Sequence, residues 1–199
     1  MKLIDDKNKI NNKQDKENKQ YVKKTNIYLL SSTGRSGSTF LSALIKSFPI
    51  TFYLFEPLRP LSRKFKLDAE LSNSMLKEIF NCNLSKHHLD LLSTEYYPLF
   101  VKRNSCNELK KCPKKERLND YCKKFNITVV KTIRTRLSSA ETFMSSSDNV
   151  KIIHLIRDPR GFITSMIKVK WNMKPRKICD KLLQDINTSH TFKTKYSKR

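Results

Sequence analysis

The sequence predicts an α/β fold in which a parallel β-sheet, flanked by helices, carries a loop similar to a phosphate-binding P-loop. Three observations predict this class. Four short apolar segments have the length of buried strands, helical segments separate the first from the second and the third from the fourth, and a Gly- and Ser-containing loop follows the first. Buried strands joined through helices are typical of parallel sheets, whose carboxyl-end loops gather at one edge and bind ligands.

The predicted strands are rich in β-branched and aromatic residues, as expected for a sheet covered on both faces. They comprise Ile27–Leu30, Thr51–Phe55, Ile127–Val130 and Lys151–Ile156. A helix-like segment around Arg136–Met144 separates the last two, and a further helix is expected at Lys177–Ile186. We therefore expect one domain from residue 26 to residue 199.

The turn Ser31–Gly37 and the helix Ser38–Phe48 follow the first strand. The helix is amphipathic, with its apolar residues on one face: Phe40, Leu41, Leu44, Ile45 and Phe48. Unpaired N–H groups at a helix start lie at the positive end of its dipole and stabilise a bound anion. The order of strand, loop and helix therefore favours an anion site over an ordinary βα turn that Ser36 or Ser38 would cap.

The residues of this loop suit a phosphate or sulfate. Gly34 and Gly37 allow the backbone to approach the anion, and Arg35 adds a positive charge. Hydroxyl donors come from Ser36, Ser38 and Thr39. Because no lysine follows Gly37, the loop lacks the arrangement expected for magnesium-dependent ATP chemistry.

Glu56 follows the second predicted strand, directly before Pro57. A carboxylate at this strand end would lie beside the anion loop and could accept a proton from a substrate hydroxyl. The alternative is a solvated turn residue.

The sequence Arg157-Asp158-Pro159 follows the last predicted strand. Asp158 and Pro159 suit the N-cap and first position of a helix that runs to about Lys170, with Ser165 inside it. Arg157 and Ser165 could hold a second phosphate, although Arg157 could instead pair with Asp158. Two cationic sites without an evident metal ligand between them suit a nucleotide with phosphates at both ends of its ribose.

Charge is high and uneven: the 199 residues carry a net charge of +23. Residues 1–25 are lysine-rich and lack apolar periodicity, so we expect a disordered polar tail. Such charge attracts any polyanion, so a non-catalytic binding protein for RNA or acidic polysaccharide is the alternative function. Aromatic residues are not interleaved with the basic runs, which argues against recognition of single-stranded nucleic acid.

Five cysteines occur without a C-x-x-C pair, so a zinc site is not expected. Four of them lie in a Cys/Lys-rich insertion at about residues 81–124, which favours a loop held by disulfides over free thiols and implies an oxidising compartment. Glycosylation sequons begin at Asn83, Asn126 and Asn187. No signal peptide and no apolar stretch of 18 residues is present.

Two motifs resemble those of the Golgi carbohydrate sulfotransferases that act on the 6-hydroxyl of GlcNAc, Gal or GalNAc. SSTGRSGSTFLSALIKSFPITFYLFEPLRPL is similar to the family's 5′-phosphosulfate loop, and VKIIHLIRDPRGFITS is similar to its 3′-phosphate motif. The resemblance covers roughly residues 26–186. It implies the sulfotransferase fold, shortened here because the family's N-terminal membrane anchor and longer C-terminal part are not found in the chain.

The resemblance implies the donor 3′-phosphoadenosine 5′-phosphosulfate (PAPS), a carbohydrate acceptor such as a glycosaminoglycan, no metal and a place in the Golgi lumen. Catalytic roles are expected for Glu56 as the base and Arg35. The 5′-phosphosulfate is expected on the segment from residue 33 to residue 40, which comprises Thr33, Gly34, Arg35, Ser36, Gly37, Ser38, Thr39 and Phe40. The 3′-phosphate is expected on Arg157 and Ser165.

Overall fold

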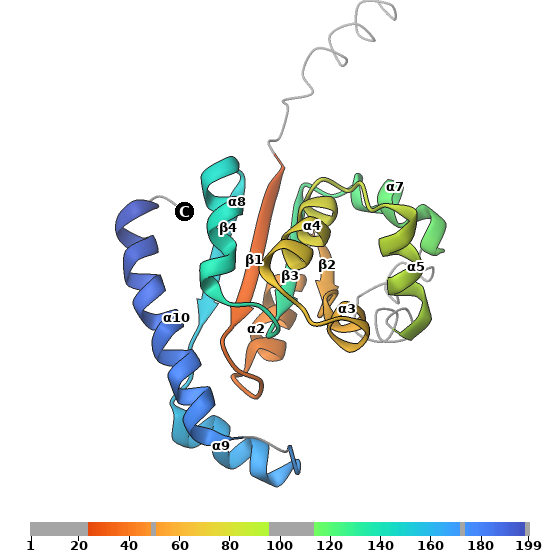
Figure 1. Ribbon diagram of the computed structural model, residues 1–199. Helices are drawn as coiled ribbons and strands as arrows, with labels where there is room; N and C mark the ends of the chain where they lie inside the picture. Colours follow the sequence, from red (N-terminus) through yellow and green to blue (C-terminus); the bar gives the residue numbers. More distant parts are fainter. Residues whose placement is uncertain (1–23, 49–50, 96–113, 172–173, 198–199) are drawn as a thin grey trace, which may run out of the picture.

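The computed structural model describes residues 24–48, 51–95, 114–171 and 174–197. Its four strands form one parallel sheet in the order β2-β3-β1-β4 (Figure 1). The strands are β1 (Thr25–Ser31), β2 (Thr51–Phe55), β3 (Ile127–Thr132) and β4 (Val150–Leu155). This confirms the predicted α/β class, with each strand within two residues of its expected bounds. All four carboxyl ends therefore meet at one edge of the sheet.

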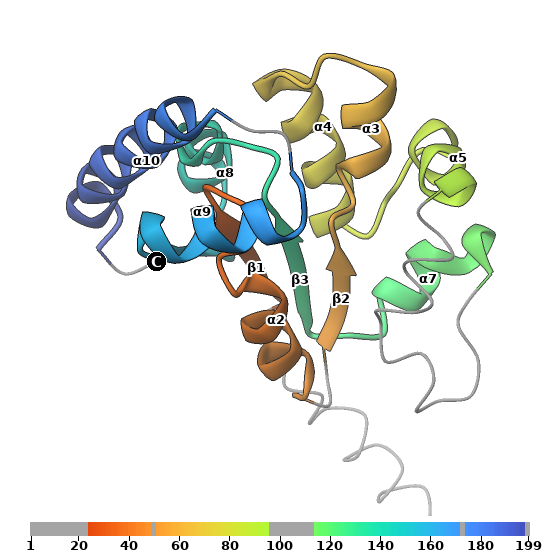
Figure 2. The ribbon, with the colours of Figure 1, turned by 90° about the horizontal axis from the view of Figure 1, so that it is seen from below.

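The helices form layers on the two faces of this sheet. Figure 2 shows α2 on one face and α4 and α8 on the other. Helix α9 lies below the carboxyl ends of the strands in Figure 1, and α10 runs beside β4. The helices are α2 (Ser38–Lys46), α3 (Arg59–Lys64), α4 (Ala69–Phe80), α5 (Lys86–Glu95), α7 (Leu118–Cys122), α8 (Glu141–Ser146), α9 (Pro159–Lys168) and α10 (Pro175–Lys195).

Several helices differ from the expected segments. The helix expected around Arg136–Met144 is a 3-10 turn, η3 (Leu137–Ala140), followed by α8. Helix α10 extends beyond the predicted bounds at both ends. Helices α3, α4, α5 and α7, with a 3-10 turn η2 (Lys115–Arg117), were not expected, and α5, η2 and α7 lie in the predicted insertion.

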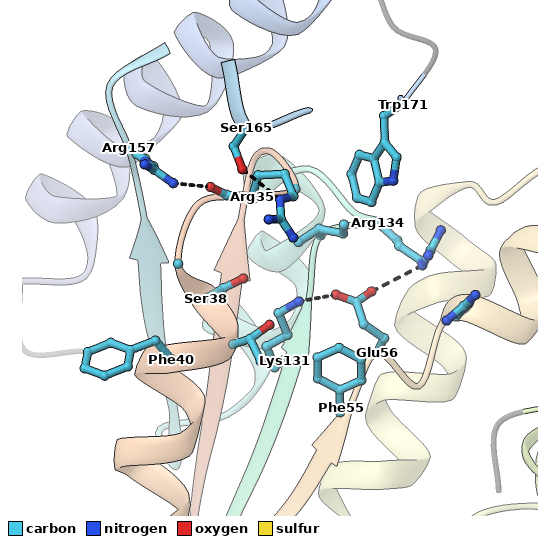
Figure 3. Close-up of a pocket in the computed structure, with 15 residues that line it drawn as sticks. Arg35, Ser38, Phe40, Phe55, Glu56, Lys131, Arg134, Arg157, Ser165 and Trp171 are labelled. Carbon is cyan, nitrogen blue, oxygen red and sulfur yellow. Dashed lines mark hydrogen bonds and ion pairs between the residues drawn. The ribbon is translucent and has the colours of Figure 1, made fainter. Parts of the chain in front are cut away.

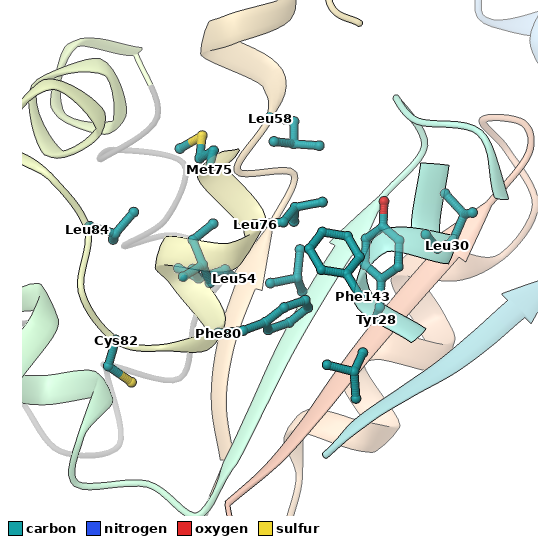
Figure 4. Close-up of a cluster of buried hydrophobic side chains, with 14 of the residues drawn as sticks. Tyr28, Leu30, Leu54, Leu58, Met75, Leu76, Phe80, Cys82, Leu84 and Phe143 are labelled. Carbon is teal, nitrogen blue, oxygen red and sulfur yellow. The ribbon is translucent and has the colours of Figure 1, made fainter. Parts of the chain in front are cut away.

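The main core lies between the sheet and the layer of α4 and α8 (Figure 4). At its centre Tyr28 of β1 packs edge-on against Phe80 of α4 and Phe143 of α8, with ring centroids 6.3 and 6.0 Å away. Leu54 of β2 is also fully buried there. Burial of large apolar side chains is the main driving force of folding, so this face holds the sheet rigid.

Helix α2 packs on the opposite face with its polar side inward. Contrary to the usual packing of an amphipathic helix, Phe40, Leu44 and Phe48 are 72%, 51% and 61% exposed. The buried residues of α2 are Ser38 and Ser42, and the Tyr53 hydroxyl donates a hydrogen bond to Ser42 Oγ at 2.9 Å. Small inward side chains bring the start of α2 close to the sheet, next to the strand ends.

A disulfide between Cys82 and Cys122 joins the ends of α4 and α7, with the Cα atoms 5.5 Å apart. The expectation of a disulfide in this region is confirmed. Cys179 of α10 is a free thiol, whereas Cys106 and Cys112 lie outside the described residues. Within the described ranges no helix is both long and apolar enough to cross a membrane.

Candidate functional site

The loop between β1 and α2 has the backbone of an anion cradle. Gly37, the N-cap of α2, has a φ of 92°, a conformation that favours glycine. A Cβ at Gly34 would overlap the indole of Trp171, so any larger residue there would displace this side chain. Arg35 also adopts a positive φ, of 60°, which is uncommon for a residue other than glycine. The loop places the first N–H groups of α2 at the carboxyl edge of the sheet, as the sequence predicts.

The hydroxyls of the loop divide into two groups. Ser36 and Thr33 are buried within the turn, where Ser36 Oγ accepts a hydrogen bond from the N–H of Ser38. Ser38 and Thr39 line the large pocket beside the loop. Ser36 and Thr33 lie outside the pocket lining and shape the cradle from inside, whereas Ser38, although also buried, and the exposed Thr39 border the pocket.

Arg35, Arg157 and Ser165 lie together, although 130 residues separate the first from the last. Arg35 Nε donates to Ser165 Oγ at 3.0 Å, and Arg157 Nη1 donates to the carbonyl oxygen of Arg35 at 2.7 Å. Both contacts are exposed and both acceptors are neutral. The guanidinium charges are thus not neutralised by these contacts and remain available for an anionic ligand.

Asp158 caps α9, as predicted, by accepting a hydrogen bond from the N–H of Arg160 at 2.8 Å. Its carboxylate also pairs with the Arg160 guanidinium at 2.6 Å. The hydrogen bonds from Arg160 lower the pKa of Asp158 to about 2. The partner of Asp158 is therefore Arg160, and Arg157 instead faces the loop.

Glu56 is a buried ion-paired carboxylate, so the alternative of a solvated turn residue is wrong. Its Oε1 accepts a hydrogen bond from Lys131 Nζ at 2.6 Å, and its Oε2 lies 3.2 Å from Arg134 Nε. The side chains of Glu56 and Lys131 are each only 4% exposed. Glu56 also has a positive φ of 51°, and its N–H donates to the carbonyl oxygen of Lys131. Strained backbone of this kind occurs often at functional sites.

Lys131 and Arg134 are site residues that the sequence prediction missed. Lys131 lies within the buried run of β3, which continues to Thr132, and its ammonium lies 4.7 Å from the ring centroid of Phe55. Burial lowers the pKa of Arg134, and the nearby Glu56 opposes this shift. A lysine directly after Ile-Thr-Val-Val in a parallel strand is the signal that could have identified Lys131, because such a position is buried.

One pocket of about 520 Å³ joins these groups at the carboxyl ends of the strands. Figure 3 shows Arg157 and Phe40 on one side of Arg35, and Glu56, Arg134 and Trp171 on the other. The lining residues are Gly34, Arg35, Gly37, Ser38, Thr39, Phe40, Phe55, Glu56, Arg59, Lys131, Ile133, Arg134, Arg157, Ser165 and Trp171. Five of them are cationic and one is acidic, which suits a ligand with several negative charges.

Among the described residues no group of three or more His, Cys, Asp or Glu side chains could hold a metal ion. The residues of the pocket instead fit a nucleotide with two anionic ends. Arg157 and Ser165, expected at one end, and Arg35 and the α2 N-terminus, expected at the other, all line this pocket, and exposed Phe40 offers a ring on which a base could stack.

The family model of the sulfotransferase domain matches residues 26–198. Carbohydrate sulfotransferase 2 of Mus musculus and of Homo sapiens are each 24% identical over 181 residues, which cover 73% of this chain and 34% of theirs. Carbohydrate sulfotransferase 1 of Danio rerio is 27% identical over 190 residues, 73% of this chain and 44% of its own. The chain thus spans less than half of the length of these relatives. No solved structure matches it.

Proposed function

The chain belongs to the sulfotransferase domain family, and on this premise we propose that it transfers the sulfuryl group of PAPS to a hydroxyl of a carbohydrate. The acceptor class follows the names of the similar carbohydrate sulfotransferases. The motif resemblance favours the 6-hydroxyl of a GlcNAc, Gal or GalNAc unit. The proposal rests on one observation. Two exposed arginines, Arg35 and Arg157, line the same pocket as the buried ion pair of Glu56 and Lys131.

PAPS would supply an activated sulfuryl group, and the exposed arginines would bind its two anionic ends. Arg35, Ser38, Thr39 and the N–H groups at the start of α2 would hold the 5′-phosphosulfate. Arg157 and Ser165 would hold the 3′-phosphate. Thr33, Gly34, Ser36 and Gly37 would maintain the backbone of the cradle, with Phe40 beside the base.

Glu56 is proposed as the base that accepts the proton of the acceptor hydroxyl. Lys131 and Arg134 hold both of its carboxylate oxygens, which fixes the direction from which a hydroxyl can approach. When Glu56 takes up the proton, its attraction for the Lys131 ammonium weakens. Lys131, which lines the same pocket as Arg35, can then stabilise negative charge that develops at the leaving phosphate.

The Golgi lumen is proposed as the location by similarity to the family. The Cys82–Cys122 disulfide supports an oxidising compartment of this kind, and the sequon asparagines Asn83 and Asn187 are exposed. Replacing both disulfide cysteines should therefore lower the yield of secreted, folded protein more than replacing Cys179 does.

Thermal unfolding with adenosine 3′,5′-bisphosphate, in the absence of magnesium, tests the donor site. At a hundred times its Kd this ligand should stabilise the protein by about 2.7 kcal/mol, which raises the Tm by roughly 5–10 °C. A response to ATP that requires magnesium would indicate a kinase. A response to RNA or heparin alone would support the non-catalytic binding protein.

A transfer assay then tests the reaction. Sulfate from radiolabelled PAPS should appear on oligosaccharides that end in GlcNAc, Gal or GalNAc. Glu56→Gln should retain bisphosphate binding and lose transfer. A Glu56→Gln protein with full activity would remove Glu56 from the mechanism.

A further inference from the structure

Helix α9 ends in a way that places Trp171 against the anion loop. The N–H of Trp171 donates to the carbonyl of Met166 at 3.1 Å, and the N–H of Lys170 donates to that of Ile167 at 2.9 Å. These two bonds are the Schellman motif, in which glycine normally occupies the left-handed position. Here that position is Lys170, with a φ of 53°. The turn directs the indole back over Met166 and onto Gly34.

A second pocket, of about 420 Å³, opens on the side of Trp171 that faces α10. Its volume is within the range of roughly 300–1,000 Å³ that is usual for small-ligand sites. Ile133, Met166 and Ile178 form an apolar floor, and Lys170 and Lys181 contribute two ammonium groups. No acidic side chain is present among the described residues that line it. Among the described residues neither lysine forms an ion pair, so both charges are available to a ligand.

The second pocket adjoins the first, since Gly34, Ile133 and Trp171 line both. Figure 3 shows Trp171 on the Glu56 and Arg134 side of the first pocket, across Arg35 from Arg157. A chain whose hydroxyl reaches Glu56 can therefore continue past Trp171, whereas a nucleotide that reaches Arg157 extends the opposite way.

We infer that this second pocket is an acceptor subsite for an acidic sugar, in which a pyranose ring packs on Trp171 while its carboxylate or sulfate contacts Lys170 and Lys181. The inference rests on the proposed function and specifies its substrate class. A flat indole with an apolar floor suits the C–H face of a sugar ring, and two unneutralised ammonium groups suit an anion.

Trp171 is the sole tryptophan of the chain, so intrinsic fluorescence reports on this pocket directly. The probes are an unsulfated poly-N-acetyllactosamine tetrasaccharide and the same tetrasaccharide with a sulfate on its internal GlcNAc, each titrated without nucleotide at 0.15 M salt. The sulfated probe should change the fluorescence with a Kd about ten-fold below that of the unsulfated probe, as one charge-assisted contact provides.

Lys170→Ala and Lys181→Ala should each reduce this preference, and together they should abolish it. Lys193→Ala is the matched control, because it removes the same charge from α10 about 18 Å farther along the helix, and it should leave the preference intact. Trp171→Ala, followed by calorimetry, should weaken both saccharides more than it weakens adenosine 3′,5′-bisphosphate, because the indole also lines the first pocket.

Two results would overturn the subsite. One is an equal response to both probes, or none, in a protein that adenosine 3′,5′-bisphosphate still stabilises. The other is a loss of bisphosphate affinity in Trp171→Ala that exceeds the loss of saccharide affinity, which would assign the pocket to the nucleotide base. Failure of the proposed function itself would show separately, as the absence of any stabilisation by the bisphosphate.

Discussion

Two charged clusters at the carboxyl edge of the sheet contrast in how their charges are balanced. In the buried cluster, at the ends of β2 and β3, Glu56 lies between Lys131 and Arg134. In the exposed cluster, at the ends of β1 and β4, the hydrogen-bond partners of Arg35 and Arg157 among the described residues are a hydroxyl and a carbonyl oxygen. The first cluster neutralises most of its charge internally, whereas the second retains charge for a ligand.

Because of this difference, the buried cluster should matter mainly for the stability of the fold and the exposed cluster mainly for ligand binding. A buried ion pair is costly to break from one side, because the remaining charge has lost both water and its partner. An exposed arginine can be removed at little cost to the fold, because water replaces its contacts. Substitutions in the buried cluster should therefore change mainly stability, and substitutions in the exposed cluster mainly ligand affinity.

Lys131→Met should have the largest effect on stability. It leaves Glu56 buried with only the partly exposed Arg134 as a counter-ion, which costs roughly 3–5 kcal/mol and lowers the Tm by about 6–20 °C. Urea and thermal unfolding measure this loss. The double variant Lys131→Met with Glu56→Gln should recover part of it, since no buried carboxylate remains unpaired. A Tm unchanged by Lys131→Met would mean that the pair is solvated, and the contrast between the clusters would disappear.

Arg157→Ala should have the opposite profile. Loss of one charge-assisted contact to a phosphate weakens adenosine 3′,5′-bisphosphate binding by about 1.5–3 kcal/mol, roughly 10- to 150-fold. The stability of the protein alone should change by about 1 kcal/mol or less. Titration calorimetry measures the affinity, and Arg160→Ala is the control, because Arg160 pairs with Asp158 and does not line the pocket. Equal affinities for the two variants would contradict the assignment of Arg157.

The exposed cluster was predictable from the sequence, while most of the buried one was not. Gly34, Gly37 and the Asp158–Pro159 cap are local signals, since each follows from a few adjacent residues. The pairing of Lys131 with Glu56 depends on a contact across 75 residues, and it becomes visible only when β2 and β3 lie side by side. Sequence reasoning identified Glu56 but not the lysine that holds it.

In the fold, too, features set by adjacent residues were predictable, whereas features set by packing between distant segments were not. Apolar runs located all four strands, because a parallel strand covered on both faces is apolar throughout. The outward direction of Phe40 was not predictable. The periodicity of α2 shows which residues share a face of the helix, but it does not show which face packs against the sheet. The hydroxyls of Ser42 and Tyr53, paired at 2.9 Å, occupy the inward side instead.

Phe40→Ala should affect binding less than Arg157→Ala does. A base stacked on an aromatic ring contributes about 1–3 kcal/mol, so affinity for adenosine 3′,5′-bisphosphate should fall about ten-fold. Binding of pyrophosphate, which has no base, should be unchanged. Phe48→Ala removes another exposed ring near the far end of α2 and should alter neither ligand. Weaker binding of pyrophosphate by Phe40→Ala would indicate a change in the loop rather than a lost stacking contact.

Asp158→Asn should have the smallest effect, because it keeps an oxygen that can cap α9 and removes only the charge that pairs with Arg160. The pKa of Asp158 is about 2, below the ordinary value of 3.8, so its charge stabilises the folded protein fully above about pH 4. This contribution disappears as the pH falls through about 2. The Tm of the wild-type protein should therefore exceed that of Asp158→Asn slightly from pH 7 down to pH 4, and the difference should vanish towards pH 2. Because Arg157 directly precedes the cap, bisphosphate affinity at pH 7 should fall at most a few-fold. A difference in Tm that is as large near pH 2 as at pH 7 would show that the cap geometry, and not the charge, distinguishes Asp from Asn at the start of α9.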